Sequence, residues 1–168
     1  MYTYSFAQWL LFFYIYCFLG WCFESSYVSL KQRHAVNRGF LHGPMLPIYG
    51  SGAIIVLFAA LPFKDSPISV YFMGMIAATL LEYVVGDAME RIFRVRYWDY
   101  SYQRFNLNGH ICLSSSIAWG FFSILMVYKL HKPFEAMVLS LPLFYCEAIS
   151  FFITLIAGAD FMASLKTA

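Results

Sequence analysis

Apolar segments long enough to cross a bilayer dominate this sequence. A helix needs about 20 residues to span the hydrocarbon core, and five stretches reach or approach that length. They are residues 6–30, 46–62, 69–91, 111–129 and 133–157. The second is short and opens with Pro47 and Gly50, which predicts a broken or tilted helix. The pattern predicts an all-α, polytopic membrane protein with about five transmembrane helices, and one integral membrane domain over residues 1–168.

The composition and the cysteines agree with this class. Hydrophobic residues make up 61% of the chain and charged residues 12%, about half the charge of soluble domains. The net charge of +2 provides no basic surface for nucleic acid. The four cysteines have no metal-type spacing, which indicates free packing residues. No basic residues and no cleavage site accompany the first segment, so we expect a retained helix.

The distribution of lysine and arginine predicts the orientation. Loops 31–44 and 91–110, with the C-terminal tail, contain eight basic residues: Lys31, Arg33, Arg38, Arg91, Arg94, Arg96, Arg104 and Lys166. The opposite side contains Lys64, Lys129 and Lys132. Positive loops stay in the cytoplasm, which places the N-terminus outside, the C-terminus inside and the chain in the cytoplasmic membrane. Basic residues that bind a substrate would give the same bias.

Glu82 is the acid that most needs an explanation. An acid near the bilayer centre costs at least ~2.5 kcal/mol and usually marks function or a buried pair. Glu82, Gly86 and Glu90 recur every four residues, so the two carboxylates share one stripe of the helix. We expect Glu82 to face protein, near Glu24 or a base of the first loop. Asp87 and Glu90 each precede an arginine by four residues, so a solvated helix end is an equal interpretation for them.

The two long loops resemble each other. Each follows an acid-bearing helix, is rich in Asn, Gly and His, and precedes a helix with an aromatic-Gly pair. The first half has Glu24, residues 37–44 (NRGFLHGP) and Tyr49-Gly50. The second has Glu82 or Glu90, residues 106–110 and Trp119-Gly120. The pattern predicts a duplicated helix-loop-helix in parallel orientation, as in transporter folds, with coincidence as the alternative.

Polar residues in these loops are candidate ligand groups. In the first loop, Asn37, Arg38 and His42 provide an amide, a cation and an imidazole, either for a ligand or as an ordinary turn. In the second, the aromatic run 97–102 is typical of a membrane interface. Asp99 within it is interpreted as a structural ion pair with a neighbouring arginine, or as an acceptor for a substrate hydroxyl.

The remaining candidates lie at helix starts and in the fifth segment. His42 and His110 each precede a return helix, and Glu147 is expected mid-membrane, either in the same cavity or paired with Arg38 or a tyrosine. No close ligand spacing indicates a metal, and no cofactor or catalytic residue is predicted. The candidate cavity or substrate residues are Glu24, Asn37, Arg38, His42, Tyr49, Glu82, Asp87, Glu90, Trp98, Asp99, Tyr100, Asn106, His110 and Glu147.

Several blocks carry a family resemblance. They are Gly20-Trp21 with Glu24, NRGFLHGP followed by PIYG, Leu81-Glu82-Tyr83 with Glu90, WDYS at 98–101, Phe105-Asn106, residues 109–113 and Trp119-Gly120. Over residues 17–120 the chain resembles the small bacterial inner-membrane proteins classed as ABC-transporter permeases. The resemblance implies a transport subunit. No GxxxxGK[ST] loop occurs in the sequence, so a separate ATPase subunit is implied, and five helices imply a homodimer or partner membrane subunits.

Three functions are consistent with these features. The first is a transport subunit in which Glu24, Glu82, Glu90 and Glu147 line a polar intramembrane cavity gated by the two loops. The second is an intramembrane enzyme, or a lipid-headgroup binder, in which an arginine holds an anionic or polar amphiphile and a histidine transfers a proton. The third is an assembly protein whose polar residues pack helices. For the first two, we expect both loops to close over one cavity in contact with membrane lipid.

Overall fold

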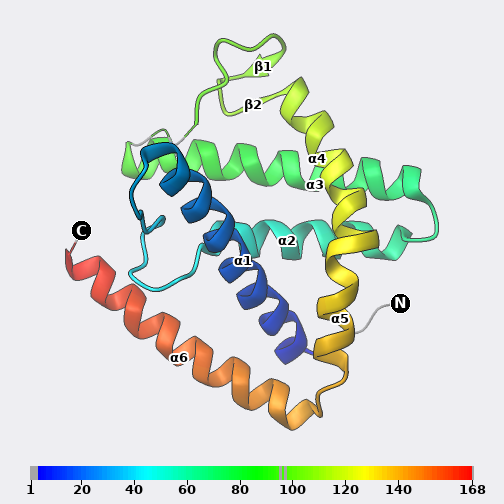
Figure 1. Ribbon diagram of the computed structural model, residues 1–168. Helices are drawn as coiled ribbons and strands as arrows, with labels where there is room; N and C mark the ends of the chain where they lie inside the picture. The colour runs from blue at the N-terminus through cyan, green and yellow to red at the C-terminus, as the bar shows by residue number, and fades with distance from the viewer. Residues whose placement is uncertain (1–3, 95, 97, 168) are drawn as a thin grey trace. The chain divides into compact units, whose positions relative to one another are not determined.

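Helices make up 76% of the chain, as the apolar segments predict. The structure, a computed structural model, describes residues 4–94, 96 and 98–167 (Figure 1). Four helices in this part are long and apolar enough to cross a membrane, namely Phe6–Gln32, Pro67–Ile92, Leu113–Leu139 and Leu143–Lys166. The shorter apolar helix Pro47–Phe63 corresponds to the weak second segment. The all-α, polytopic class is therefore confirmed.

The elements follow one another with few long connections. They are α1 (Phe6–Gln32), α2 (Pro47–Ala60), the 3-10 turn η1 (Leu61–Phe63), α3 (Pro67–Ala88), the π-helical turn η2 (Met89–Phe93), β1 (Asn106–Leu107), β2 (Ile111–Cys112), α4 (Leu113–Leu125), the π-helical turn η3 (Met126–Leu130), α5 (His131–Leu139) and α6 (Leu143–Thr167). The two short strands pair antiparallel, with Asn106 opposite Cys112.

Side-chain caps fix the start of three of these helices. The Ser5 side chain accepts from the Gln8 amide, and the Gln8 side chain accepts from the Ser5 amide, before α1. Ser66 precedes Pro67 and caps α3. The Cys112 side chain accepts from the Ser115 amide at α4. Each cap satisfies a backbone amide that has no partner inside the helix.

The last two membrane segments differ from the sequence prediction. Residues 113–139 form one continuous helical span through η3 and α5, and the next helix begins at Leu143. The predicted break before Pro133 is therefore wrong. Pro133 lies inside this span, three residues after the π-helical turn η3, and the helix continues past its missing backbone amide. Glu147 consequently lies in the second turn of α6 and not in the middle of a helix.

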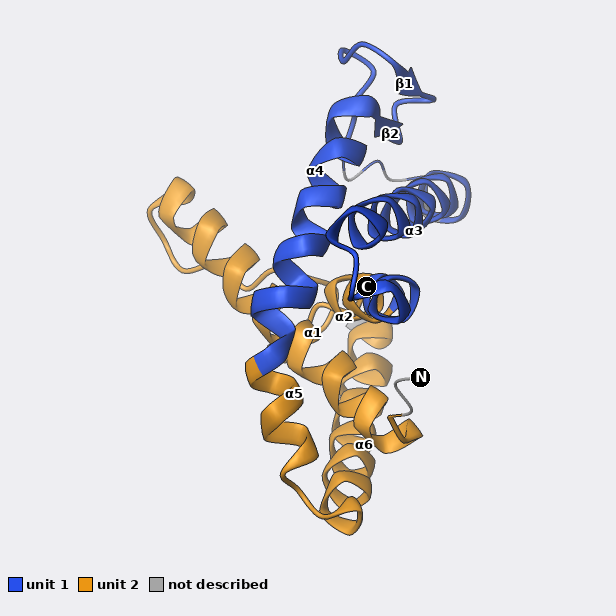
Figure 2. Ribbon diagram, turned by 90° about the vertical axis from the view of Figure 1, so that its right-hand side faces the viewer, with its two compact units in different colours: residues 1–2, 55–132 blue, residues 3–54, 133–168 orange. Residues whose placement is uncertain are grey.

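Two compact units share the chain. Unit 1 contains residues 55–132, and unit 2 contains residues 4–54 and 133–167 of the described chain (Figure 2). In unit 1, α3 packs along α4 at glycines, since a Cβ on Gly74 would lie 2.2 Å from the Cβ of Ser123. In unit 2, α1 packs on α6 and on the first turns of α2, where Gly20 faces the ring of Tyr49. Small residues that admit close approach are typical of membrane helix interfaces.

Candidate functional site

Glu82 of α3 is held by three neutral donors of unit 1. Tyr100 donates to Oε1 at 3.1 Å, and Trp119 and Ser115 of α4 donate to Oε2 at 2.9 Å and 3.3 Å. Ser115 also reaches the Cys112 carbonyl at 2.9 Å, so Tyr100 and Trp119 are the principal donors. Glu82 thus faces protein as predicted, and its partners within unit 1 are neutral donors.

The whole acidic stripe of α3 and η2 faces the second loop. Gly86, between the two acids, leaves room for His110, whose Nδ1 would lie 3.0 Å from a Cβ at that position. Glu90 contacts His110 Nε2 at 3.3 Å and Arg96 at 2.7 Å. The four-residue spacing therefore predicted correctly that Glu82, Gly86 and Glu90 share one face of the helix.

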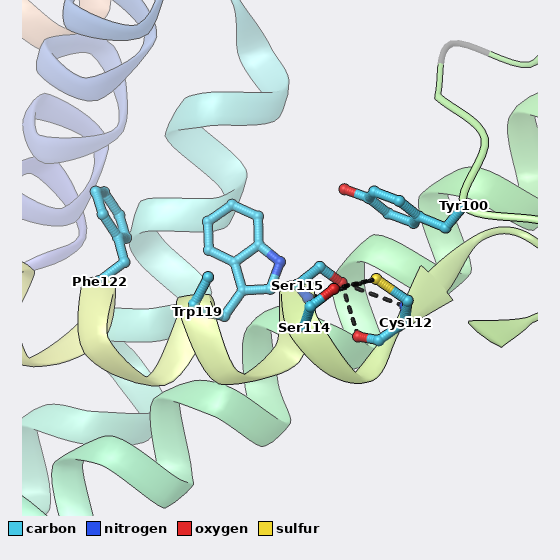
Figure 3. A pocket seen from close by; sticks show the side chains of 7 residues that line it. Tyr100, Cys112, Ser114, Ser115, Trp119 and Phe122 are labelled. Carbon is cyan, nitrogen blue, oxygen red and sulfur yellow. Dashed lines mark hydrogen bonds between the residues drawn. The ribbon is translucent and has the colours of Figure 1, made fainter. Parts of the chain in front are cut away.

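An open pocket borders the donors of Glu82. Its volume is about 560 Å³, and its lining is Tyr100, Cys112, Ser114, Ser115, Ala118, Trp119 and Phe122 (Figure 3). The polar groups lie where the second loop enters α4, and Ala118 and Phe122 continue the lining along α4. Burial and the neighbouring Glu82 carboxylate raise the pKa of Tyr100, which keeps its hydroxyl a donor.

Arg96 connects two acids at the end of α3. It bonds both oxygens of Glu90, at 2.9 Å and 2.7 Å, and Asp99 at 3.2 Å. The hydrogen bonds to Glu90 raise the pKa of Arg96. Hydrogen bonds from Ser101, together with the charge of Arg96, lower the pKa of Asp99. The predicted ion pair between Asp99 and a neighbouring arginine is therefore present.

The partner predicted for Glu90 is wrong. Arg94 has φ 55°, a left-handed conformation that ends the helix after η2. The i, i+4 geometry therefore stops before Arg94, and Arg96 takes its place. The other predicted pair is confirmed, because Arg91 Nε lies 2.7 Å from Asp87. Arg91 is exposed there, which supports the solvated helix end for Asp87.

Other polar residues of the second loop stabilise the loop itself. Asn106 donates to the carbonyls of Ser101 and Gln103, and its oxygen accepts from the Gly109 amide. Trp98 donates to the His110 carbonyl at 2.8 Å. Both candidates therefore organise the turn. Tyr97, from the predicted aromatic run, lies outside the described residues.

In unit 2, Glu24 of α1 has a cationic partner. Arg38 Nη2 lies 3.4 Å away, and the Tyr49 hydroxyl donates at 2.9 Å. Asn37 accepts from Trp21 and donates to the His42 carbonyl. The residues selected in the first loop thus come together around the end of α1, as an ion pair with a surrounding turn.

Asp160 of α6 contacts the first loop and was not among the candidates selected from the sequence. The amides of His42 and Gly43 donate to its two oxygens at 3.2 Å and 2.9 Å. It is an acid in an apolar helix with no base four residues away, the same signal that selected Glu82. Its position near the C-terminal end of the chain hid it.

His42 also contacts Asp160 and Ser164, but not as a catalytic triad. Its Nδ1 lies 3.5 Å from Asp160 Oδ1 and 2.8 Å from Ser164 Oγ. In a triad, the acid and the hydroxyl meet different ring nitrogens. This cluster therefore ties the first loop to α6 and does not activate the serine.

Two further observations concern the other candidates. The Glu147 side chain is exposed on α6, and it forms no hydrogen bond or ion pair within residues 4–94, 96 and 98–167. Across those same ranges, no group of three or more His, Cys, Asp or Glu side chains could hold a metal ion.

Comparison with known families identifies the class. The family model described as "Putative ABC-transporter type IV" matches residues 11–165, which includes both units and α6. The chain belongs to this family. The resemblance carried by the loop blocks is thereby confirmed. The match covers nearly the full length of the chain and supports an ABC-transporter-type membrane protein. Comparisons with curated proteins and with solved structures give no match.

Proposed function

We propose that the chain is the membrane-embedded permease subunit of an ABC-type transporter. The observation that carries the proposal is the family match over residues 11–165. The sequence contains no phosphate-binding GxxxxGK[ST] loop, so ATP hydrolysis belongs to a separate subunit. Assembly with that subunit, and with a second membrane chain, completes the transporter.

In this proposal the acids held at protein-facing surfaces mark the polar part of the pathway. Glu82 and Glu24 both lie on helices that lead into a long loop, and each accepts from an aromatic side chain of the return helix. Carboxylates inside a bilayer are retained at a cost and mark substrate or ion pathways. The loops 33–46 and 94–112 are the proposed contact surface for the ATPase.

The proposed orientation places both long loops in the cytoplasm. Lys129 and Lys132 lie inside the continuous span Leu113–Leu139, so the connection at 140–142 carries no charge. The basic residues of the connections therefore remain concentrated in the two long loops, which supports the proposed orientation. Cysteine introduced at Asp65 should react with an impermeant reagent from outside intact cells, and cysteine at Arg104 should not. Labelling at Arg104 instead would invert the orientation.

Purification with a nucleotide probe tests the transporter assignment. The tagged full chain is purified from its native membranes in mild detergent and irradiated with azido-ATP. We expect a second polypeptide to be photolabelled, and its vanadate-sensitive ATPase activity to depend on assembly with the chain. An untagged preparation is the control. A chain that purifies with no azido-ATP-labelled subunit under any extraction condition contradicts the proposal.

A further inference from the structure

Among the residues that the structure describes, most of the hydrogen-bonded acids of the helices and loops have a base beside them, whereas Glu82, like Glu135, accepts a hydrogen bond without one. Glu24 is paired with Arg38, Asp87 with Arg91 and Asp160 with His42. Glu90 and Asp99 share Arg96. Within the described ranges, Glu82 forms no ion pair and accepts only neutral hydrogen bonds. Its negative charge is therefore solvated by dipoles but not neutralised.

The uncompensated carboxylate lies directly behind a wall of the pocket. Tyr100, Ser115 and Trp119, which line the pocket, are the same three residues that donate to Glu82. Figure 3 shows the Tyr100 hydroxyl and the Trp119 indole nitrogen directed toward each other across this polar end. The pocket volume of about 560 Å³ lies within the range of about 300–1,000 Å³ typical of small-molecule sites.

The lining combines negative charge with aromatic rings and an apolar extension. Tyr100, Trp119 and Phe122 contribute three aromatic rings, and their faces attract cations, most strongly when the cation is desolvated. Ala118 and Phe122 continue the wall along α4 without any charge. An anion would meet the field of Glu82, and Arg96 of the second loop already holds two acids.

We propose that this pocket binds an organic cation that has an apolar body, with its ammonium group at the Tyr100–Trp119 end and its apolar part along α4. The inference rests on the proposed transport function, for which it names the substrate class. The same chemistry occurs in a free amphiphilic amine and in a membrane lipid with an amine headgroup. The test therefore separates these two sources.

Cys112 provides a reporter inside the pocket. Cys112 is only 3% exposed, and against the opposing effect of burial, hydrogen bonds with Ser114 and Ser115 lower the pKa of its thiol. Purified full chain in neutral detergent is treated with trimethylammonioethyl or sulfonatoethyl methanethiosulfonate. Mass spectrometry of the Cys112 peptide gives the labelling rate for each reagent.

We expect the cationic reagent to label Cys112 about tenfold faster than the anionic one, since a nearby unit charge changes local concentrations by that order. Glu82→Gln should abolish the preference, and Glu82→Asp should retain part of it. Asp65→Asn, which removes an exposed acid of the same unit, is the matched control and should leave the preference unchanged. Thermal melts of all variants verify that they are folded.

Protection experiments then identify the source of the cation. Benzyltrimethylammonium should slow the labelling of Cys112 in detergent if a free cation is the occupant. Phosphatidylethanolamine vesicles should slow it, relative to phosphatidylglycerol vesicles, if a lipid is. Equal labelling by the two reagents, no labelling by either, a preference that survives Glu82→Gln, or no protection from either source overturns the inference. The assay uses no ATP and no partner, so its failure leaves the azido-ATP test of the transporter assignment unaffected.

Discussion

In each unit, an acid lies beside the same combination of an earlier aromatic residue and an aromatic-Gly pair. The two acids differ in whether a base neutralises them. Glu24 follows Phe13 by eleven residues, and Glu82 follows Tyr71 by eleven residues. In each unit, the glycine of an aromatic-Gly pair packs on that earlier aromatic residue, and the aromatic partner donates to the acid. This correspondence supports a duplicated helix-loop-helix. Only Glu24, however, has an arginine beside it.

The difference shows that this arrangement of aromatic residues and glycine can occur with or without a base beside the acid. Where the loop provides Arg38, the acid forms an ion pair that closes the end of its helix. Where the loop provides Tyr100, the acid keeps its charge beside an open pocket. We therefore expect substitutions of the acid in unit 1 to affect binding in the pocket, and substitutions of the acid in unit 2 to affect mainly the ion pair at the end of α1. The following predictions test that division.

The largest expected effect comes from Glu82→Leu. It leaves the Trp119 N–H and the Tyr100 O–H without their acceptor, and each unsatisfied buried donor costs about 1–3 kcal/mol. Glu82→Gln keeps an acceptor and should cost much less. Thermal unfolding in detergent, followed by tryptophan fluorescence, measures both. Equal losses for the two variants would show that the charge, not the hydrogen bonding, stabilises unit 1.

The aromatic-Gly pairs should differ in their tolerance of alanine. A Cβ on Gly50 would lie 2.7 Å from the backbone oxygen of Phe13, whereas a Cβ on Gly120 would meet the Tyr71 ring at 2.5 Å. A ring can rotate and a backbone cannot, so Gly50→Ala should lose more stability, within the range of about 1–3 kcal/mol for overpacking. Thermal melts of the two variants provide the comparison. A larger loss for Gly120→Ala would contradict the assignment of a rigid contact to unit 2.

Removing the ion pair of unit 2 should have a smaller effect. Arg38 is 44% exposed, and solvent-screened pairs contribute less than about 1 kcal/mol. Arg38→Ala and Glu24→Gln should each lower the melting temperature slightly, and the double variant should lose less than the sum of the two. A strictly additive double variant would show that the two residues act separately. Neither variant should change the charge preference at Cys112.

The smallest effect concerns acid stability of the second loop. The pKa of Asp99 is lowered by hydrogen bonds from Ser101 and by Arg96, so its contribution is present above the unfolded pKa of about 3.9. It disappears as the pH falls through the lower folded pKa. Fluorescence of Trp98 should therefore change below about pH 4, in the range set by this reference value. Asp99→Asn should show the acid-like signal already at neutral pH, and an unchanged titration in that variant would exclude Asp99 as its cause.

Helix composition predicted the acids better than it predicted their partners. Glu82 could be selected because an acid in an apolar helix needs solvation, and its stripe with Glu90 follows from helical spacing alone. Its donors Tyr100 and Trp119 lie 18 and 37 residues along the chain, where only the folded loop brings them close. Arg96, rather than the predicted Arg94, pairs with Glu90 because the left-handed conformation of Arg94 ends the helix.

Segment limits and the last helix were harder to predict. Pro133 suggested a helix break, but the helix continues through it, with a π-helical turn over residues 126–130 directly before α5. Asp160 carried the same local signal as Glu82, but nothing in the sequence indicated its partners, which are backbone amides about 117 residues earlier. Backbone donors leave no signature in a sequence, which limits prediction at such contacts.

The contact between Asp160 and the first loop affects the order in which the tertiary contacts of the protein can form during synthesis. Unit 1 is a continuous stretch of chain, residues 55–132, so all donors for Glu82 are synthesised before α6. The amides of His42 and Gly43 receive their acceptor only when Asp160, in α6, has been synthesised. Chains fold from the N-terminus during synthesis, yet here the earlier loop acquires its final contacts last. Premature termination before Asp160 would therefore leave the first loop, rather than the second, without its acceptor.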